Sequence, residues 1–170
     1  MLKRLVAAAL LGLLPLAAAS ADSWVSYAAA ADGFSATFPG NPVLAENAAE
    51  ATRSYTVDLG AAPNDVHYFI EVDRFKPGEL PASPTTGFYA AVATNSVQAM
   101  KGHIVSQRAL AGSGNPAGYE FVADLPNTFN VTRYYATDNR LYTLVYTAPA
   151  GSKITPEAQR FLDSFRLTGR

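Results

Sequence analysis

The segment of residues 131–148 limits most strongly how this chain can fold. It reads Val131-Thr-Arg-Tyr-Tyr-Ala, then Thr-Asp-Asn-Arg, then Leu141-Tyr-Thr-Leu-Val-Tyr-Thr-Ala. β-Branched and aromatic residues dominate both flanks, and such residues favour strands with a pleated, half-buried surface. Asp138 and Asn139 tolerate the positive φ angles of a tight turn. The segment therefore predicts two antiparallel strands joined by a two-residue turn.

A helix is expected directly after this hairpin. Thr155 can cap a helix and Pro156 suits its first position. Four apolar residues then follow at the spacing i, i+3, i+4 and i+7, namely Ala158, Phe161, Leu162 and Phe165. Such a stripe needs a second apolar surface. We therefore expect this helix to lie on the sheet.

The rest of the chain predicts further strands and one more helix. Apolar and polar residues alternate in segments 24–27, 33–38, 52–59, 65–75, 103–110 and 117–125. Segment 85–102 has helical spacing through Tyr89, Ala93, Val97 and Met100, with Gly102 at its end. Segment 45–51 is expected to be a link. The order predicts an α+β fold with a central, mainly antiparallel sheet covered by helices on both faces, an α/β/α sandwich.

The first residues indicate export. Lys3 and Arg4 precede an apolar run, and Ala19-Ser-Ala21 is a typical cleavage sequence. We therefore expect residues 1–21 to be a cleaved signal peptide and residues 22–170 to form one periplasmic or secreted domain. An uncleaved N-terminal anchor is the alternative. No membrane span is expected after cleavage, because no further long apolar segment follows.

The cysteine content limits covalent stabilisation and lipid anchoring, and the net charge limits which molecules the protein can bind. The chain has no cysteine, so neither a disulfide nor a lipid-anchored cysteine is expected. The formal net charge is −1, and loss of Lys3 and Arg4 would make it more negative. This balance argues against nucleic acid and against anionic lipid. A protein or a small molecule is the expected partner of a monomeric domain.

The two histidines, His67 and His103, are the candidate catalytic or metal-binding groups, because such sites favour histidine. His67 shares a strand face with Glu71 and Asp73. At about 3.3 Å per residue, however, His67 and Glu71 are about 13 Å apart, too far to share one ion. His103 follows Gly102 and is expected at the surface. We therefore predict no catalytic residue, no metal and no cofactor. The alternative is a small periplasmic hydrolase or ligand-processing enzyme that uses His67 or His103 with Asp and Ser residues distant in sequence.

Three further patterns have simpler structural explanations. The glycine-rich segment 112–118 is similar to a phosphate loop, but Pro116 and a strand follow it, which favours a hairpin loop. Asn130-Val-Thr132 matches a glycosylation sequon but falls in an expected strand. Five tyrosines crowd the second half of the chain and are expected to pack across strands rather than to form a ligand platform, namely Tyr119, Tyr134, Tyr135, Tyr142 and Tyr146.

Both ends of the expected domain resemble PsbP-like domains. The segment Gly33-Phe-Ser-Ala-Thr-Phe-Pro-Gly-Asn-Pro42 is similar to their opening motif. Arg140-Leu-Tyr142 and Phe161-Leu-Asp-Ser-Phe-Arg-Leu167 resemble their closing strand and helix. The family includes the extrinsic PsbP subunit of photosystem II, a Ran-binding nuclear import factor and many exported bacterial proteins. The resemblance implies a single PsbP-like α/β/α domain, acting as a non-catalytic binding or assembly module. It carries no site residue over.

Two polar loops are the expected partner-binding region, because recognition concentrates in loops on a rigid scaffold. These are segments 76–84 and 112–118. Phe75 and Tyr119 lie at their bases and could supply aromatic anchors. The remaining candidate residues are Lys76, Glu79, Ser113 and Asn115. The alternative is that both loops are mobile connectors.

Overall fold

The computed structural model describes residues 24–62, 64–112, 114–137 and 139–168. The expected signal peptide, Ser113 and Asp138 therefore lie outside the described residues. The elements are β1 (Val25–Ala29), β2 (Phe34–Phe38), β3 (Val43–Asn47), β4 (Thr52–Leu59), β5 (Val66–Arg74), α1 (Thr86–Ala99), β6 (His103–Leu110), β7 (Gly118–Asp124), β8 (Thr128–Thr137), β9 (Arg140–Pro149), α2 (Pro156–Ser164) and β10 (Arg166–Leu167).

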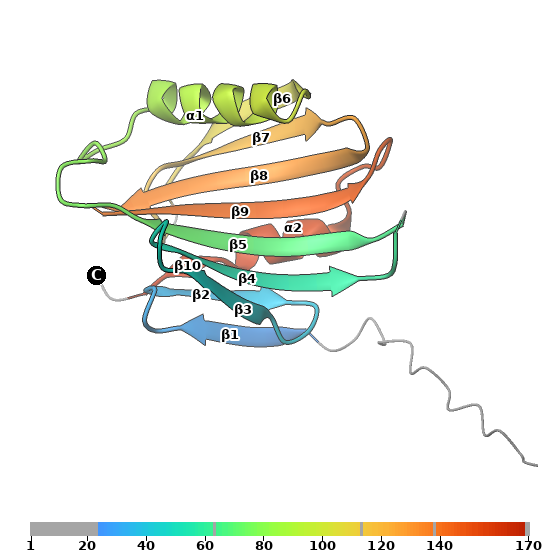
Figure 1. The fold of residues 1–170 in the computed structure, drawn as a ribbon, viewed down its shortest axis with the longest axis horizontal. Helices are drawn as coiled ribbons and strands as arrows, with labels where there is room; N and C mark the ends of the chain where they lie inside the picture. Colours follow the sequence, from blue (N-terminus) through green and yellow to red (C-terminus); the bar gives the residue numbers. More distant parts are fainter. Residues whose placement is uncertain (1–23, 63, 113, 138, 169–170) are drawn as a thin grey trace, which may run out of the picture.

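The strands form two sheets, and every pairing is antiparallel (Figure 1). The large sheet has the order β3-β4-β5-β9-β8-β7-β6, and the small sheet has the order β1-β2-β10. Thr137 pairs with Arg140, which confirms the expected hairpin of β8 and β9. The mainly antiparallel sheet is likewise confirmed.

The larger core lies between the two sheets and α2. Alternate residues of β4, β5, β9 and β8 face it, including Tyr55, Ile70 and Leu144, all at most 2% exposed. Phe34 of β2 stacks on Phe165 with the ring centres 5.5 Å apart. Thr155 caps α2 through a 3.2 Å hydrogen bond from the Ala158 amide, as expected.

A smaller core lies between α1 and the other face of the large sheet. Thr85 caps α1, and the buried Tyr89, Ala93 and Val97 pack against β7 and β8. Successive strand residues point to opposite faces. Tyr134 belongs to this core and Tyr135 to the larger one, so α1 and α2 lie on opposite sides of the large sheet.

The expected cover of both faces by helices is not confirmed. α1 lies mainly over β6, β7 and β8, and the strands β4, β5 and β9 carry half-buried side chains on that side. On the opposite side, the small sheet shares the covering role with α2. The aromatic residues of β1 and β2 are large enough to close this core together with α2.

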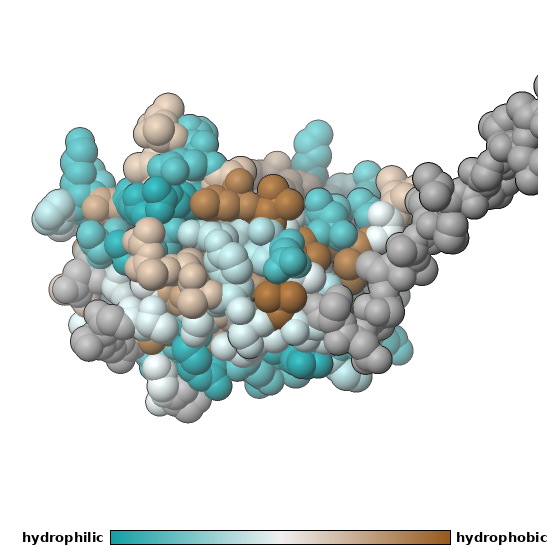
Figure 2. Space-filling model, turned by 90° about the horizontal axis from the view of Figure 1, so that it is seen from below, coloured by the Kyte–Doolittle hydropathy of each residue, from teal (hydrophilic) through white to brown (hydrophobic). Residues whose placement is uncertain are grey.

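Two strands were not expected from the sequence. β3 pairs with β4 through five residues, all of which are exposed, so no alternation marks it. Its Val43 and Leu44 are 71% and 48% exposed. On the side of the molecule shown in Figure 2, hydrophobic residues form small groups among hydrophilic ones. β10 has only two residues and is defined by its pairing with Ser35 and Phe34.

Gly102 follows the end of α1, as expected, but it is not the residue with the left-handed backbone that often ends a helix. Lys101, not Gly102, has the positive φ angle, at 59°. A Cβ atom on Gly102 would lie 2.3 Å from Leu125 Cδ2 and 2.7 Å from the Asp124 carbonyl oxygen. Glycine at this position is therefore required by the close approach of the helix end to the sheet.

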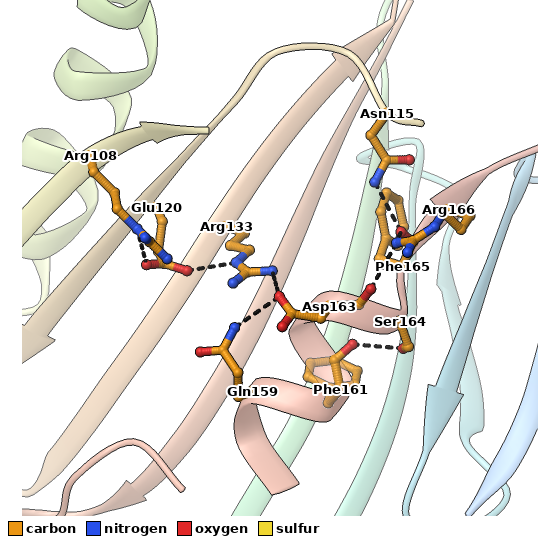
Figure 3. A network of polar contacts seen from close by, with 10 residues as sticks. All are labelled: Arg108, Asn115, Glu120, Arg133, Gln159, Phe161, Asp163, Ser164, Phe165 and Arg166. Atoms are coloured by element: carbon orange, nitrogen blue, oxygen red, sulfur yellow. Dashed lines mark hydrogen bonds and ion pairs between the residues drawn. The ribbon is translucent and has the colours of Figure 1, made fainter. Parts of the chain in front are cut away.

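An ion-pair network ties α2 to the large sheet (Figure 3). Arg133 donates from Nε to Glu120 over 2.6 Å and from Nη1 to Asp163 over 2.7 Å. Glu120 also accepts a 2.7 Å hydrogen bond from Arg108. The Arg133 side chain is only 5% exposed, whereas that of Arg108 is 61% exposed. Both arginines therefore bind the Glu120 carboxylate, Arg133 from the buried side and Arg108 from the solvent-exposed side.

We predict that Arg133→Met lowers the free energy of unfolding by about 3–5 kcal/mol, because it leaves the buried Glu120 charge without its inner partner. The matched control, Arg108→Met, removes an exposed partner of the same carboxylate and should cost less than about 1 kcal/mol. Urea unfolding of both variants measures the difference. Equal losses would show that burial does not govern this network.

We also predict that Phe161→Ala lowers the free energy of unfolding by about 3–5 kcal/mol. Phe161 is fully buried and its ring lies 5.2 Å from that of Phe38 and 5.4 Å from that of Tyr68. Ile154→Ala is the control, since Ile154 is 42% exposed. Thermal and urea unfolding that leave the two variants equally stable would contradict the role of α2 in closing the core.

Candidate functional site

The two loops expected to bind a partner meet at one hollow. Ala82 of segment 76–84 and Pro116 of segment 112–118 both line it, and its volume is about 470 Å³. The other lining residues come from the β1–β2 turn, the β8–β9 hairpin and the end of the chain, namely Gly33, Ala136, Thr137, Asn139, Arg140, Tyr142, Leu167 and Thr168. We call this site the loop hollow. It joins segments that are far apart in sequence.

Arg140 and Gly33 fix one wall of the loop hollow. Arg140 donates from Nη1 to the Asp32 carbonyl oxygen over 3.1 Å and from Nη2 to that of Ala31 over 3.3 Å. Gly33 has a φ of +70°, and a Cβ atom there would lie 3.0 Å from Arg140 Nη1. The guanidinium group therefore lies directly against the β1–β2 turn and gives this wall a positive charge.

Segment 76–84 is partly packed, although no packing residue was expected in it. Leu80 is 7% exposed and belongs to the smaller core. The Lys76 amide donates to Glu79 Oε2 over 2.8 Å, and the Glu79 amide donates to the Lys76 carbonyl oxygen over 3.1 Å. An adjoining hollow of about 430 Å³ lies against this segment and shares Ala82 and Asn139 with the loop hollow.

Three of the candidate residues are engaged within the domain. Asn115 donates to the Phe165 carbonyl oxygen and accepts from the Leu167 amide, both over 2.9 Å. Tyr119 is 2% exposed and donates its hydroxyl to Gln107 over 2.7 Å. Phe75 is half-buried against the smaller core. Asn115 therefore holds β10 in place, and the side chains of Tyr119 and Phe75 pack inward.

Lys76 and Glu79 are the two described candidates with exposed side chains. Asn139, Arg140 and Thr168 line the loop hollow but were not among the expected site residues. Their positions follow from contacts between distant segments, for which a single sequence contains no signal. All five clustered tyrosines are buried, which confirms the expectation that they pack across strands.

The histidines do not form a nucleophilic or metal centre in the described part of the chain. His67 Nδ1 lies 2.6 Å from Asp58 Oδ1, and its Nε2 lies 2.9 Å from Asp65 Oδ2. His103 has a 73% exposed side chain, 3.7 Å from Asp124. Neither ring contacts a serine among the described hydrogen bonds. No group of His, Asp and Glu within those residues is placed to hold a metal.

The ion pairs of His67 predict a pH-dependent stability. The hydrogen bond to Asp58 raises the pKa of His67 above 6.5, against the opposing effect of burial. A raised folded-state pKa stabilises the protein fully below the unfolded-state pKa, and this contribution is lost as the pH rises through the folded-state pKa. We predict that His67→Gln destabilises the protein more at about pH 5 than at about pH 9.

Urea unfolding of wild type and His67→Gln at both pH values measures this dependence. His103→Gln is the control, because its side chain is largely exposed and its nearest carboxylate is more distant. A destabilisation by His67→Gln that does not change with pH would contradict the charged state assigned to the ring.

The two-sheet arrangement is a PsbP-like fold. The solution structure of cyanobacterial PsbP (CyanoP) from Synechocystis sp. PCC 6803 is similar over 96% of this chain and 98% of that chain, with a TM-score of 0.61 and 12% sequence identity. At this identity the similarity establishes the fold alone. The sequence matches no protein-family model and no curated protein. Within the described residues, neither helix is long and apolar enough to cross a membrane.

Proposed function

We propose that this protein is an exported, non-catalytic binding or assembly module that engages a protein partner at the loop hollow. The observation that carries the proposal is the convergence there of the two loops that the sequence favours for recognition. Binding surfaces often consist of loops held by a rigid scaffold. The PsbP-like domains that the sequence resembles are also binding or assembly modules. The expected signal peptide, residues 1–21, supports a periplasmic or secreted location. We propose that the domain acts there as a monomer.

The shape and charge of the site fit a segment of a protein chain. The loop hollow and the adjoining hollow share Ala82 and Asn139, so together they form one continuous surface. Arg140 supplies a positive charge at one wall, which suits a carbonyl or carboxylate group of the partner. Lys76 and Glu79 add exposed charges of both signs nearby. A hydrolase based on His67 or His103 has no comparable support, because within the described residues the hydrogen-bond and ion-pair partners of both rings are carboxylates.

The test is to fill the loop hollow without disturbing the core. We predict that Ala82→Trp abolishes capture of the partner from a periplasmic extract, because the indole occupies both adjoining hollows. Ala150→Trp is the matched control, since Ala150 is also an exposed loop alanine but lies beyond the far end of β9. Immobilised wild type and both variants are compared by quantitative mass spectrometry of the retained proteins.

Melting temperatures of the three proteins accompany the capture experiment. Loss of the same retained protein with Ala82→Trp alone, at an unchanged melting temperature, supports the site. Equal capture by wild type and Ala82→Trp would overturn it. Shortened versions of segments 76–84 and 112–118 that keep Leu80, which packs in the core, and Asn115, which holds β10, then test which loop contributes more of the contact.

A further inference from the structure

A small polar hollow lies where α2, β8, β10 and segment 112–118 meet, and we call it the arginine hollow. Its volume is about 170 Å³. This is below the roughly 300–1,000 Å³ of pockets that hold drug-sized ligands, so it suits a small molecule. Its polar lining consists of Asn115, Arg133, Tyr135, Asp163 and Arg166. Among the described residues, it shares no lining residue with the loop hollow.

The ion-pair network beside this hollow alternates in charge and ends on an arginine. Arg108, Glu120, Arg133 and Asp163 follow one another, joined by hydrogen bonds of 2.7, 2.6 and 2.7 Å. Figure 3 shows Arg133 and Arg166 on opposite sides of Asp163. Within the described ion pairs, Arg166 has no carboxylate partner. The network thus has three guanidinium groups for two carboxylates, an excess of one positive charge.

Arg166 keeps two donor groups that the fold does not use. Its Nη1 donates to two backbone carbonyl oxygens at the end of α2, both over 2.7 Å. A guanidinium group has five N–H donors in a fixed fork. Nε and Nη2 form no hydrogen bond among the described ones, and the residue is exposed. Two such neighbouring N–H groups can bind both oxygens of a carboxylate.

Tyr135 and Arg133 form the inner wall of the hollow and favour an anion. Tyr135 is 6% exposed, and the Arg133 side chain is 5% exposed. Burial raises the pKa of Tyr135, and the charge of Arg133 opposes this only in part, so the hydroxyl keeps its proton at neutral pH. Arg133, the hydrogen-bonding partner of this hydroxyl, can only donate. The hydroxyl proton is therefore available to an acceptor.

Asp163 limits the ligand to a single negative charge. Burial acts to raise the pKa of Asp163, but hydrogen bonds from Gln159 and Arg133 hold it below its ordinary value, so the carboxylate is ionised at neutral pH. It would repel the doubly charged form of phosphate more strongly than a singly charged carboxylate. Ala111 and Leu162 are the aliphatic residues of the lining, and Leu162 is only 1% exposed. They leave room for a short alkyl group only.

We infer that the arginine hollow binds a small monocarboxylate, whose oxygens accept hydrogen bonds from Arg166 Nε and Nη2 and from the Tyr135 hydroxyl. The excess positive charge of the network specifies the anion, and the small volume specifies its size. This site is separate from the loop hollow and goes beyond the proposed function.

The experiment compares acetate with acetamide, which has the same size but no charge. Binding is followed by NMR chemical-shift titration at constant ionic strength, using the backbone amides of residues 133, 135 and 166 and the Arg166 Nε–H signal. Wild type should bind acetate about ten-fold more tightly than acetamide, because hydrogen bonds to charged groups are stronger. Inorganic phosphate in its doubly charged form should bind more weakly than acetate.

Three variants test the assigned contacts. Arg166→Gln should weaken acetate binding about ten-fold, and Tyr135→Phe about five-fold, as expected for loss of a charge-assisted hydrogen bond in each case. Lys153→Gln removes one positive charge from an exposed residue before the other end of α2 and should bind acetate like wild type. Thermal unfolding verifies that each variant is folded. If Arg166→Gln does not fold, Arg166→Lys replaces it, since it keeps the charge but loses the paired donors.

Each other outcome overturns a defined part of the inference. Equal affinity for acetate and acetamide overturns the anionic class of ligand, and tighter binding of phosphate than of acetate overturns the monocarboxylate. Unchanged acetate binding in the Arg166 variant, or the absence of saturable shifts in wild type, overturns the site itself. Unchanged binding in Tyr135→Phe overturns the contact with the hydroxyl. None of these results bears on capture at the loop hollow.

Discussion

The arrangement of the two sheets depends on the buried carboxylate of Asp32. Asp32 is fully buried in the β1–β2 turn, where Tyr55 and Arg74 hydrogen-bond to its carboxylate and Arg53 lies 3.6 Å away. Burial raises the pKa of Asp32, but these hydrogen bonds and charges outweigh that effect and hold the pKa below its ordinary value. An isolated buried charge would be costly, so this turn is stable only where β4 and β5 supply the partners. The small sheet is thereby fixed on the large one.

That attachment makes the two faces of the large sheet chemically different. On the side held by Asp32, the small sheet and α2 exclude water, and aromatic rings fill the space between the layers. On the other side, α1 covers β6 and β7 but leaves the face of β5 and β9 partly open. Burial raises the pKa of both Glu71 and Asp73 there, although each remains partly accessible. The open face therefore holds two carboxyl groups that are half-buried and whose pKa values are raised.

The sequence predicted the strands in which buried and exposed residues alternate, and the helix whose start is marked by neighbouring residues in the chain. β4 and β5 alternate in hydrophobicity because one face is buried, and Thr155-Pro156 marks the start of α2 whatever the tertiary structure. β3 could not be predicted, because all five of its residues are exposed and only its pairing with β4 defines it. The loop hollow was anticipated only as two separate loops. That Ala82 and Pro116 line one cavity, and that Asn115 binds β10 instead, depends on contacts across the whole chain.

The central strand β9 extends from the loop hollow to the open face of the large sheet. Arg140 at its start lines the loop hollow, whereas Val145 and Thr147 are half-buried on the face that α1 leaves partly open. β9 is hydrogen-bonded to β5 on one side and to β8 on the other, so its backbone is held along its length. The half-buried side chains of β9 therefore lie on a fixed backbone, while the alternate residues, including Leu144 and Tyr146, fill the core beneath them.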